Sequence, residues 1–144
     1  MLVVVDTNVM WQAFKGKGSI SREILTLILN GKIELALSEA VFLEYEDVLK
    51  RSYSLEHFSL SIPQVDTVLD LIAATAKWHK IYYQFRPNLK DEADNMVVEL
   101  AVTCGAKYLI TSNIKDFTIR SDLKFDDLSV VTPVQFIQIW RKLL

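Results

Sequence analysis

The sequence is poor in cysteine and histidine and has no long apolar run. Its 144 residues include one cysteine, Cys104, and two histidines, His57 and His79. One cysteine excludes a disulfide framework and favours a reducing compartment, and so few sulfur and imidazole ligands support a zinc site poorly. No apolar run approaches the roughly 20 residues of a membrane span, and the start, MLVVVDTNVM, has no basic segment and reaches Asp6 too early for a signal peptide. We therefore expect a cytoplasmic protein with no membrane contact.

Glycine and proline are also scarce, with four and three residues, and no stretch has the composition of a linker, a repeat or a low-complexity segment. The length suits one domain, so we expect a single domain over residues 1–144. The chain is 51% hydrophobic and 24% charged, which is enough apolar sequence for a core. Its net charge of −2 gives no general attraction to nucleic acid, so such a partner would need a local basic patch.

Short β-branched runs alternate with longer helical periods along the chain. The runs predict strands at 2–5, 33–38, 80–85, 107–111 and 128–132. The helical periods predict helices over about 20–30, 38–51, 63–77, 90–106 and 133–143. Asp91 is the expected N-cap of the fourth helix and Gly105 its stop, whereas residues 52–61 remain unassigned.

Strands separated by helices of ten or more residues imply right-handed crossovers and a parallel sheet. The strands at 2–5 and 107–110 are apolar throughout, as a sheet covered on both faces requires. We therefore expect an α/β fold, a three-layer α/β/α sandwich with a central parallel sheet. In such sheets, sites form beyond the carboxyl ends of the strands. Asp6 follows the first strand, and TSNIKD, residues 111–116, follows a later one.

Two acids have both an ordinary structural interpretation and a functional one. Asp6 is placed to form an Asx-turn or a helix cap, or to hold a chemical group at the sheet edge. Glu44 lies in SEAVFLEYEDVLKR, where Glu46 and Asp47 face Lys50 and Arg51 at i, i+4 as solvated pairs do. Glu44 instead lies beside the apolar stripe, either as a surface side chain with a buried stem or as an acid turned toward the sheet.

A second group of polar side chains lies in the later part of the chain. Asp94 aligns at i+4 and i+7 with Val98 and Ala101, at the mouth of a core-facing helical stripe, although an acid there also favours the helix dipole. Asp91 is three residues earlier, so both carboxylates can project the same way. In TSNIKDF, Ser112 or Asn113 can cap a short helical turn. Alternatively, three side chains of this segment join the acids at the sheet edge: Thr111, Asn113 and Asp116.

These positions come from separate segments and converge on one edge of the predicted sheet. Carboxylates so close together need a counter-charge, which a divalent metal supplies. Hard oxygen ligands select Mg²⁺ or Mn²⁺ rather than zinc. One or two such ions activate water and stabilise a departing oxygen in phosphodiester hydrolysis.

Three segments taken in order, VVVDTNVMWQAF, LSEAVFLEYEDVLKR and KDEADNMVVELAVTCGAKYLITSNIKDF, resemble the PIN domain. The nearest likeness is to small prokaryotic proteins of the VapC-like toxin type, and it covers nearly the whole chain. The resemblance implies a PIN-like fold and a metal-dependent ribonuclease with an acidic site. By position, Asp6 corresponds to the strand-one Asp, Glu44 to the helix Glu, and Asp94 to the Asp that begins the later helix.

The sequence departs from the family pattern at one position. The family often has Thr-x-Asp at the later strand end, and here the third residue is Asn113. Asn adds no negative charge, which lowers the expected metal affinity, and Asp116 is the residue that can supply the missing charge. The toxin subgroup often shows this Thr-x-Asn-x-x-Asp arrangement. Asn8 is expected to orient Asp6 by hydrogen bonding.

The resemblance also implies partners. Asp6 and Asp94 would hold the main ion, with Glu44 and Asp116 completing the site, and RNA is the expected substrate. Small PIN proteins often form dimers, and the toxins pair with an antitoxin protein, so a homodimer and an antitoxin are expected; the apolar excess of DTVLDLIAATAKW fits an oligomer interface. Trp11 and Phe14 are candidates to stack on bases. The candidate phosphate contacts are five basic side chains: Lys15, Lys17, Arg22, Arg86 and Lys90.

Two other functions compete with this hypothesis. A haloacid-dehalogenase-type phosphatase also begins with a strand-end Asp, but it needs a second Asp two residues later, where this chain has Asn8. A catalytically degenerate PIN-fold module that binds RNA or protein is the other alternative. Asn113 favours it, and the retention of Asp6, Glu44, Asp94 and Asp116 opposes it.

Overall fold

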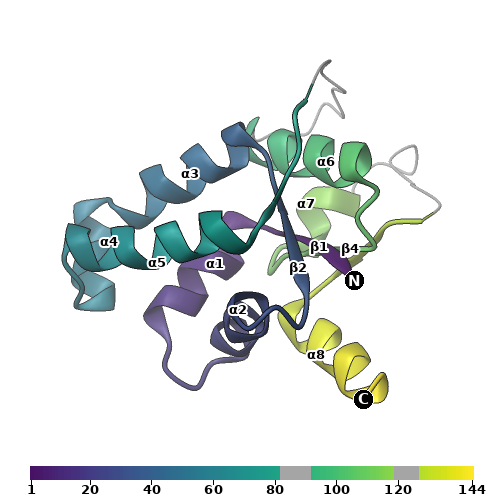
Figure 1. Cartoon of the computed structure of the whole chain (residues 1–144), viewed down its shortest axis with the longest axis horizontal. Helices are drawn as coiled ribbons and strands as arrows, with labels where there is room; N and C mark the ends of the chain where they lie inside the picture. Colours follow the sequence, from purple (N-terminus) through teal and green to yellow (C-terminus); the bar gives the residue numbers. More distant parts are fainter. Residues whose placement is uncertain (82–91, 119–126) are drawn as a thin grey trace.

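The computed structural model describes residues 1–81, 92–118 and 127–144. Strands and helices alternate along these ranges, as shown in Figure 1. The strands are β1 (Leu2–Val5), β2 (Glu34–Leu37), β3 (Lys77–Trp78), β4 (Tyr108–Ile110) and β5 (Ser129–Val131). The helices are α1 (Thr7–Lys15), α2 (Ile20–Leu29), α3 (Glu39–Leu49), α4 (Ser52–Phe58), α5 (Ile62–Thr75), α6 (Glu92–Cys104), α7 (Ile114–Thr118) and α8 (Pro133–Lys142).

The strands form one five-stranded sheet in the order β3-β2-β1-β4-β5, and every pairing is parallel. The centre of the sheet is the β1–β4 pair, in which Val3 lies opposite Tyr108 and Val5 opposite Ile110. Helices α6 and α7 lie on one side of the sheet, and α1, α2 and α8 lie on the other (Figure 1). The predicted three-layer α/β fold with a central parallel sheet is confirmed.

The central strands are fully apolar because helices cover both faces of the sheet. Val3, Val4 and Val5 of β1 are at most 1% exposed, and Leu109 and Ile110 of β4 are completely buried. Burying a side chain of this kind contributes about 1.5–3 kcal/mol. Packing on both sides therefore fixes the height at which β1 and β4 end, and with it the positions of the polar residues that follow.

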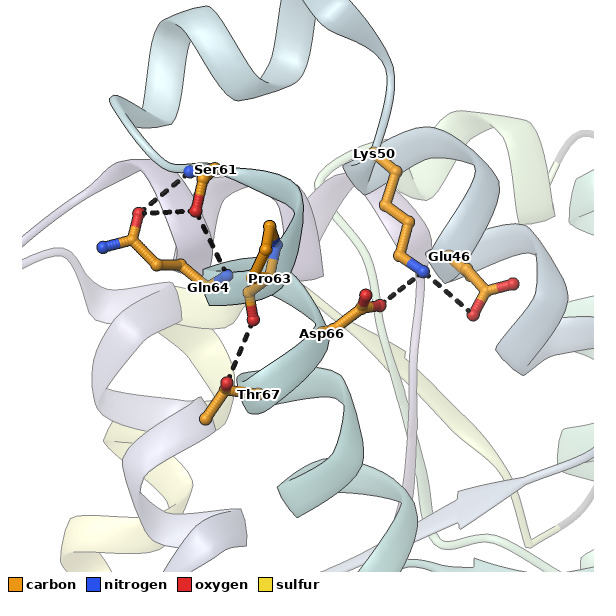
Figure 2. Close-up of polar contacts among 7 residues, drawn as sticks. All are labelled: Glu46, Lys50, Ser61, Pro63, Gln64, Asp66 and Thr67. Atoms are coloured by element: carbon orange, nitrogen blue, oxygen red, sulfur yellow. Dashed lines mark hydrogen bonds and ion pairs between the residues drawn. The ribbon is translucent and has the colours of Figure 1, made fainter.

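Helices α3 and α5 are joined by polar contacts at their neighbouring ends (Figure 2). The Lys50 ammonium group at the end of α3 pairs with Asp66 of α5, and lies 3.3 Å from the Glu46 carboxylate on its own helix. Ser61 and Gln64 form a capping box at the start of α5, which begins with a proline in its first turn. The predicted i, i+4 pairs of α3 are both present, since Asp47 also pairs with Arg51 at 2.7 Å.

The predicted elements are confirmed to within two residues at each end, except for one strand, and two helices of the structure had no predicted counterpart. The strand predicted at 80–85 is wrong for residues 80–81, which belong to no strand, and its remainder lies outside the described residues. The edge strand β3 lies just before it, at Lys77–Trp78. The unassigned segment forms α4, and α1 was not predicted. Gly105 does end α6, with φ of +66°, while Asp91 lies outside the described residues. In the described ranges, no helix has the length and apolarity to cross a membrane.

Candidate active site

The strand order places a crevice between β1 and β4. From β1 the chain builds outward through β2 to β3, whereas β4 leads to β5 in the opposite direction. The connections therefore diverge at the carboxyl ends of β1 and β4, which is the position where open parallel sheets bind ligands. Asp6 follows β1 and Thr111 follows β4, so these two residues lie at the divergence point.

The Asp6 carboxylate is buried at this point and held by both of its oxygens. It is 5% exposed; Oδ1 accepts a hydrogen bond of 2.8 Å from the Thr7 N–H, and Oδ2 accepts one of 2.8 Å from the Thr111 hydroxyl. Asp6 is the N-cap of α1, so the helix dipole also favours its negative charge. The predicted helix cap is therefore present and is formed by Oδ1. Oδ2 instead points across the sheet to Thr111 at the end of β4.

A small network extends from Thr111. Its Oγ accepts a hydrogen bond of 3.1 Å from the Asn113 N–H, and its own N–H bonds the Val131 carbonyl at 2.9 Å. Asn8, half-buried in the first turn of α1, accepts a hydrogen bond of 3.4 Å from the Ser112 N–H. Asn8 thus ties the end of β1 to the end of β4, while Thr7 and Thr111 are the donors that orient Asp6. The Asn113 side chain is exposed.

Helix α3 is anchored to the same edge by Tyr45. This side chain is completely buried, and its hydroxyl donates a hydrogen bond to the carbonyl of Val5, the residue before Asp6. Burial, and then the negative charge of Asp6, raise the pKa of Tyr45 well above its ordinary value of 10.0, so the hydroxyl stays protonated and remains a donor. Glu44 precedes Tyr45 and is half-buried. The anchor therefore fixes how close Glu44 comes to the end of β1.

Helix α6 brings the third acid to this edge. It runs toward the start of β4 and packs on β1, β2 and α3, so its first turn lies at the carboxyl ends of the parallel strands. Asp94 is in that first turn and is half-buried. The predicted inward face is confirmed, because Val98 is 4% and Ala101 is 1% exposed. Asp91 lies outside the described residues; Asp116 belongs to α7, next to this edge, and its side chain is not described.

Two buried polar residues of α6 were missed by the sequence interpretation. Asn95 and Glu99 are each 6% exposed and lie one turn apart, so they share a helix face. The available signal was the run MVVELAV, in which one acid interrupts an apolar stretch. Tyr45 was also missed, because a tyrosine within an amphipathic helix is most often an ordinary core residue.

Asp6, Glu44 and Asp94 are the candidate acids whose side chains the structure describes; they come from three separate elements and do not form a tight cluster. Among the side chains that the structure describes, no three from His, Cys, Asp and Glu are gathered closely enough to form a ready-made metal site. The side chains of Asp91 and Asp116 are not among those described.

The predicted basic contacts are distributed unevenly. Lys15 is exposed at the end of α1, and Lys17 is exposed two residues later. With a rise of about 1.5 Å per residue, Lys15 lies about 13 Å along the helix axis from Asp6. The Arg22 guanidinium donates to the carbonyls of Ala13 and Phe14, so it caps the end of α1. Phe14 is 4% exposed, and the prediction that its ring stacks on a base is wrong for that reason. Arg86 and Lys90 lie outside the described residues.

The protein is therefore an α/β protein with an acidic site at the carboxyl end of its parallel sheet. The site contains a buried carboxylate with a hydrogen bond to each oxygen, and the two helices that converge there each carry an acid. The family model described as PIN domain matches residues 2–115. This match spans well over half of the chain, and the chain belongs to the PIN domain family. PIN domains are generally nucleases, which agrees with an acidic site at this edge.

Two solved structures have a similar fold. VapBC2 from Rickettsia felis, solved bound to a DNA fragment from its promoter, is 18% identical with a TM-score of 0.62; the alignment covers 90% of this chain and 98% of that one. FitAB bound to the IR36 DNA fragment is also 18% identical, with a TM-score of 0.56 and coverage of 91% and 94%. At this identity the likeness concerns the fold. A comparison with curated protein sequences gives no match.

Proposed function

We propose that this chain is a metal-dependent endoribonuclease that hydrolyses RNA phosphodiester bonds, acting in the cytoplasm as the toxin of a toxin–antitoxin pair. The observation that carries the proposal is Asp6, an acid 5% exposed at the divergence point of the sheet, with hydrogen bonds to Thr7 and Thr111 that fix its orientation. A buried carboxylate is costly unless hydrogen bonds or a cation offset its charge, so a bound cation would stabilise Asp6 further.

The donor set suits Mg²⁺ or Mn²⁺. Each carboxylate oxygen has two acceptor positions, so a hydrogen bond from Thr7 or Thr111 does not by itself prevent Asp6 from binding an ion. Asp6 and Asp94 would hold the ion, and Glu44 and Asp116 would complete the site directly or through water. All of these are hard oxygen ligands. When bound, such an ion lowers the pKa of water and offsets charge on the reacting phosphate.

The chain's own residues hold and orient the site. Thr111 and Thr7 set the direction of the Asp6 carboxylate, and Tyr45 holds α3, and so Glu44, against the end of β1. In this proposal either Glu44 or Asp116 orients the attacking water. Asn8 keeps the loop after β4 close to α1 by accepting a hydrogen bond from the Ser112 N–H, and the Asn113 N–H donates to the Thr111 hydroxyl within that loop. This placing of reacting groups is a large part of hydrolytic catalysis.

The toxin role is supported by the fold. VapBC2 and FitAB are complexes of a toxin with its antitoxin, and the fold of this chain is similar to them over at least 90% of its length. An antitoxin partner and a homodimer are therefore parts of the proposal. The apolar side chains Leu71 and Trp78, 52% and 48% exposed within and just after α5, are available for such contacts.

The test is the cleavage of a labelled single-stranded RNA with Mg²⁺, Mn²⁺ or EDTA. We expect metal-dependent cleavage that Asp94→Asn reduces by at least about 100-fold, because even partners that only support metal ligands are worth 10–100-fold. Asp70→Asn is the matched control, since Asp70 is an exposed acid on α5. Cleavage that persists in EDTA, or that Asp94→Asn leaves unchanged, would contradict the proposal.

A degenerate binding module is the second candidate, and Asn113 favours it. The position that would carry a fourth charge holds an exposed amide. This alternative predicts that the protein binds RNA or a partner protein without cleaving RNA under any metal. The same assay separates the two functions, because RNA that is bound and intact in Mn²⁺ supports the module alone.

A further inference from the structure

An aromatic cluster covers the contact between α1 and α4. Trp11 of α1 and Tyr53 of α4 stack with an interplanar angle of 18° and ring centroids 6.3 Å apart, and the His57 ring lies 4.3 Å from Tyr53. We call these three side chains the aromatic platform. Helix α4 lies in the segment that the sequence left unassigned, so this arrangement was not foreseen.

Trp11 and Phe58 join α1 to α4, whereas Tyr53 and His57 lie at the surface. Phe58 is 8% exposed, and its ring centroid lies 5.3 Å from that of Trp11 and 5.7 Å from that of Phe14. The Trp11 Nε1–H donates to the Ser54 hydroxyl at 2.9 Å, and that hydroxyl donates to the Val48 carbonyl at 2.7 Å. The orientation of the Trp11 ring is therefore fixed. Tyr53 nevertheless remains 65% exposed, and His57 is exposed beside it.

The charges around the platform suit a polyanion. The Lys15 ammonium group lies 5.4 Å from the centroid of the Trp11 ring, and Lys17 is exposed two residues later. Arg51 precedes α4 and pairs with Asp47 at 2.7 Å, and Glu56 is the exposed acid of α4 itself. Rings interleaved with cations are the surface that single-stranded nucleic acids use, because each base offers a flat face and each nucleotide a phosphate.

The platform is continuous with the candidate active site. Trp11 lies three residues after Asn8 and four after Thr7, so it is on the same face of α1 as these two residues and about one and a half turns from the N-cap Asp6. On α3, Val48 is one turn after Glu44, and its carbonyl accepts the Ser54 hydrogen bond that positions Trp11. A chain lying across α1 and α3 would therefore meet both the acids and the rings.

We infer that the aromatic platform is a stacking subsite for a base of single-stranded RNA, next to the bond that is cleaved. The inference rests on the proposed function and adds where the substrate is held. An amphipathic helical peptide would need aliphatic anchors in an apolar groove. This surface instead presents one near-parallel pair of rings, Trp11 and Tyr53, with a tilted His57 ring and cations beside it. Because the Trp11 ring is already fixed by its hydrogen bond to Ser54, its ordering adds little to the conformational entropy lost on binding.

The experiment measures the affinity of a fluorescein-labelled single-stranded oligoribonucleotide by anisotropy, in EDTA so that the RNA stays intact, with the full chain. Tyr53→Leu removes the ring and is expected to weaken binding by about 5- to 150-fold, the range found when a stacking side chain is removed. Tyr53→Phe keeps the ring and is expected to bind within about 2-fold of the wild type, because stacking does not need the hydroxyl. Trp140→Leu is the matched control, since Trp140 is a half-buried ring on α8, away from α4 (Figure 1). It is also expected to bind within about 2-fold of the wild type.

Steady-state cleavage with Mn²⁺ separates this inference from the proposed function. If RNA is cleaved and Tyr53→Leu raises KM with kcat unchanged, both stand. If RNA is cleaved and Tyr53→Leu binds and cleaves as the wild type does, the subsite is overturned and the ribonuclease is not. If RNA is bound through Tyr53 but never cleaved, the ribonuclease fails and the subsite stands.

Two further outcomes overturn the inference. The first is equal RNA affinity in all variants together with a change of oligomeric state in Tyr53→Leu, measured by size-exclusion chromatography with light scattering. That result would make the platform a contact between copies of the chain. The second is equal weakening by Tyr53→Leu and Trp140→Leu, which would indicate non-specific binding to aromatic rings.

Discussion

Replacing Thr111 by valine tests the hydrogen bonding that holds Asp6. The change keeps the shape of the side chain and removes its hydroxyl, which is completely buried and donates to the Asp6 carboxylate at 2.8 Å. A hydrogen bond to a charged group contributes about 1.5–3 kcal/mol. The Asn113 N–H also loses its acceptor. We therefore expect Thr111→Val to lower the free energy of unfolding by about 2–3 kcal/mol at pH 7.

Urea unfolding in EDTA measures this loss. With an m-value of about 1–3 kcal/mol/M, the midpoint should fall by roughly 1 M or more while m stays constant. Thr111→Ser is the control, because it keeps the hydroxyl and loses only a methyl group, worth about 0.8 kcal/mol. A Thr111→Val protein as stable as the wild type, or more stable than Thr111→Ser, would refute the assignment of this hydrogen bond as the one that holds Asp6.

Three other predictions concern the surroundings of the site. Tyr45→Phe leaves the buried Val5 carbonyl without its donor and should cost about 1–3 kcal/mol in urea unfolding. The pKa of Tyr45 is raised in the folded state, so its contribution to the free energy of unfolding is complete below pH 10. Above pH 10 the unfolded chain ionises and this contribution decreases. The difference in stability between the wild type and Tyr45→Phe should therefore become smaller at high pH. Arg22→Met should lower the melting temperature through loss of the two carbonyl contacts at the end of α1, and an unchanged melting temperature with weaker RNA binding would instead make Arg22 a phosphate contact. Lys50→Met should lower the free energy of unfolding by less than about 1 kcal/mol, because the ion pairs of Lys50 with Asp66 and Glu46 are partly exposed. This loss of stability should become smaller in high salt. A loss that does not depend on salt would mean that packing of the side chain matters more than its charge.

The sequence predicts the fold where side-chain periodicity is long. Strands such as 2–5 are continuous apolar runs, and α3 and α5 have clear stripes and caps, so their positions follow from local physics. Strand β3 contains two residues, which is too short for any period. Helix α1 begins directly at a strand-end acid and ends at a glycine-rich loop, and its interior mixes amide, sulfur and aromatic side chains.

In the candidate site, too, some features follow from local sequence patterns and others do not. That Asp6 and Thr111 lie at the ends of adjacent strands follows from the parallel pattern and the strand-end rule. The hydrogen bond between them joins residues 105 positions apart, and the Tyr45 anchor joins residues 40 apart, so neither has a local signal. The burial of Asn95 and Glu99 depends on what covers α6, which a single helix pattern does not specify.

The central claim is that the carboxylate at the end of β1 holds a divalent ion, and Mn²⁺ binding measured by calorimetry tests it most directly. The comparison is between the wild type, Asp6→Asn and the exposed control Asp70→Asn, each shown to be folded by circular dichroism. The account predicts that Mn²⁺ binds to the wild type and to Asp70→Asn alike and that Asp6→Asn loses this binding. Equal Mn²⁺ affinity in all three proteins, or no binding to the wild type, would contradict it.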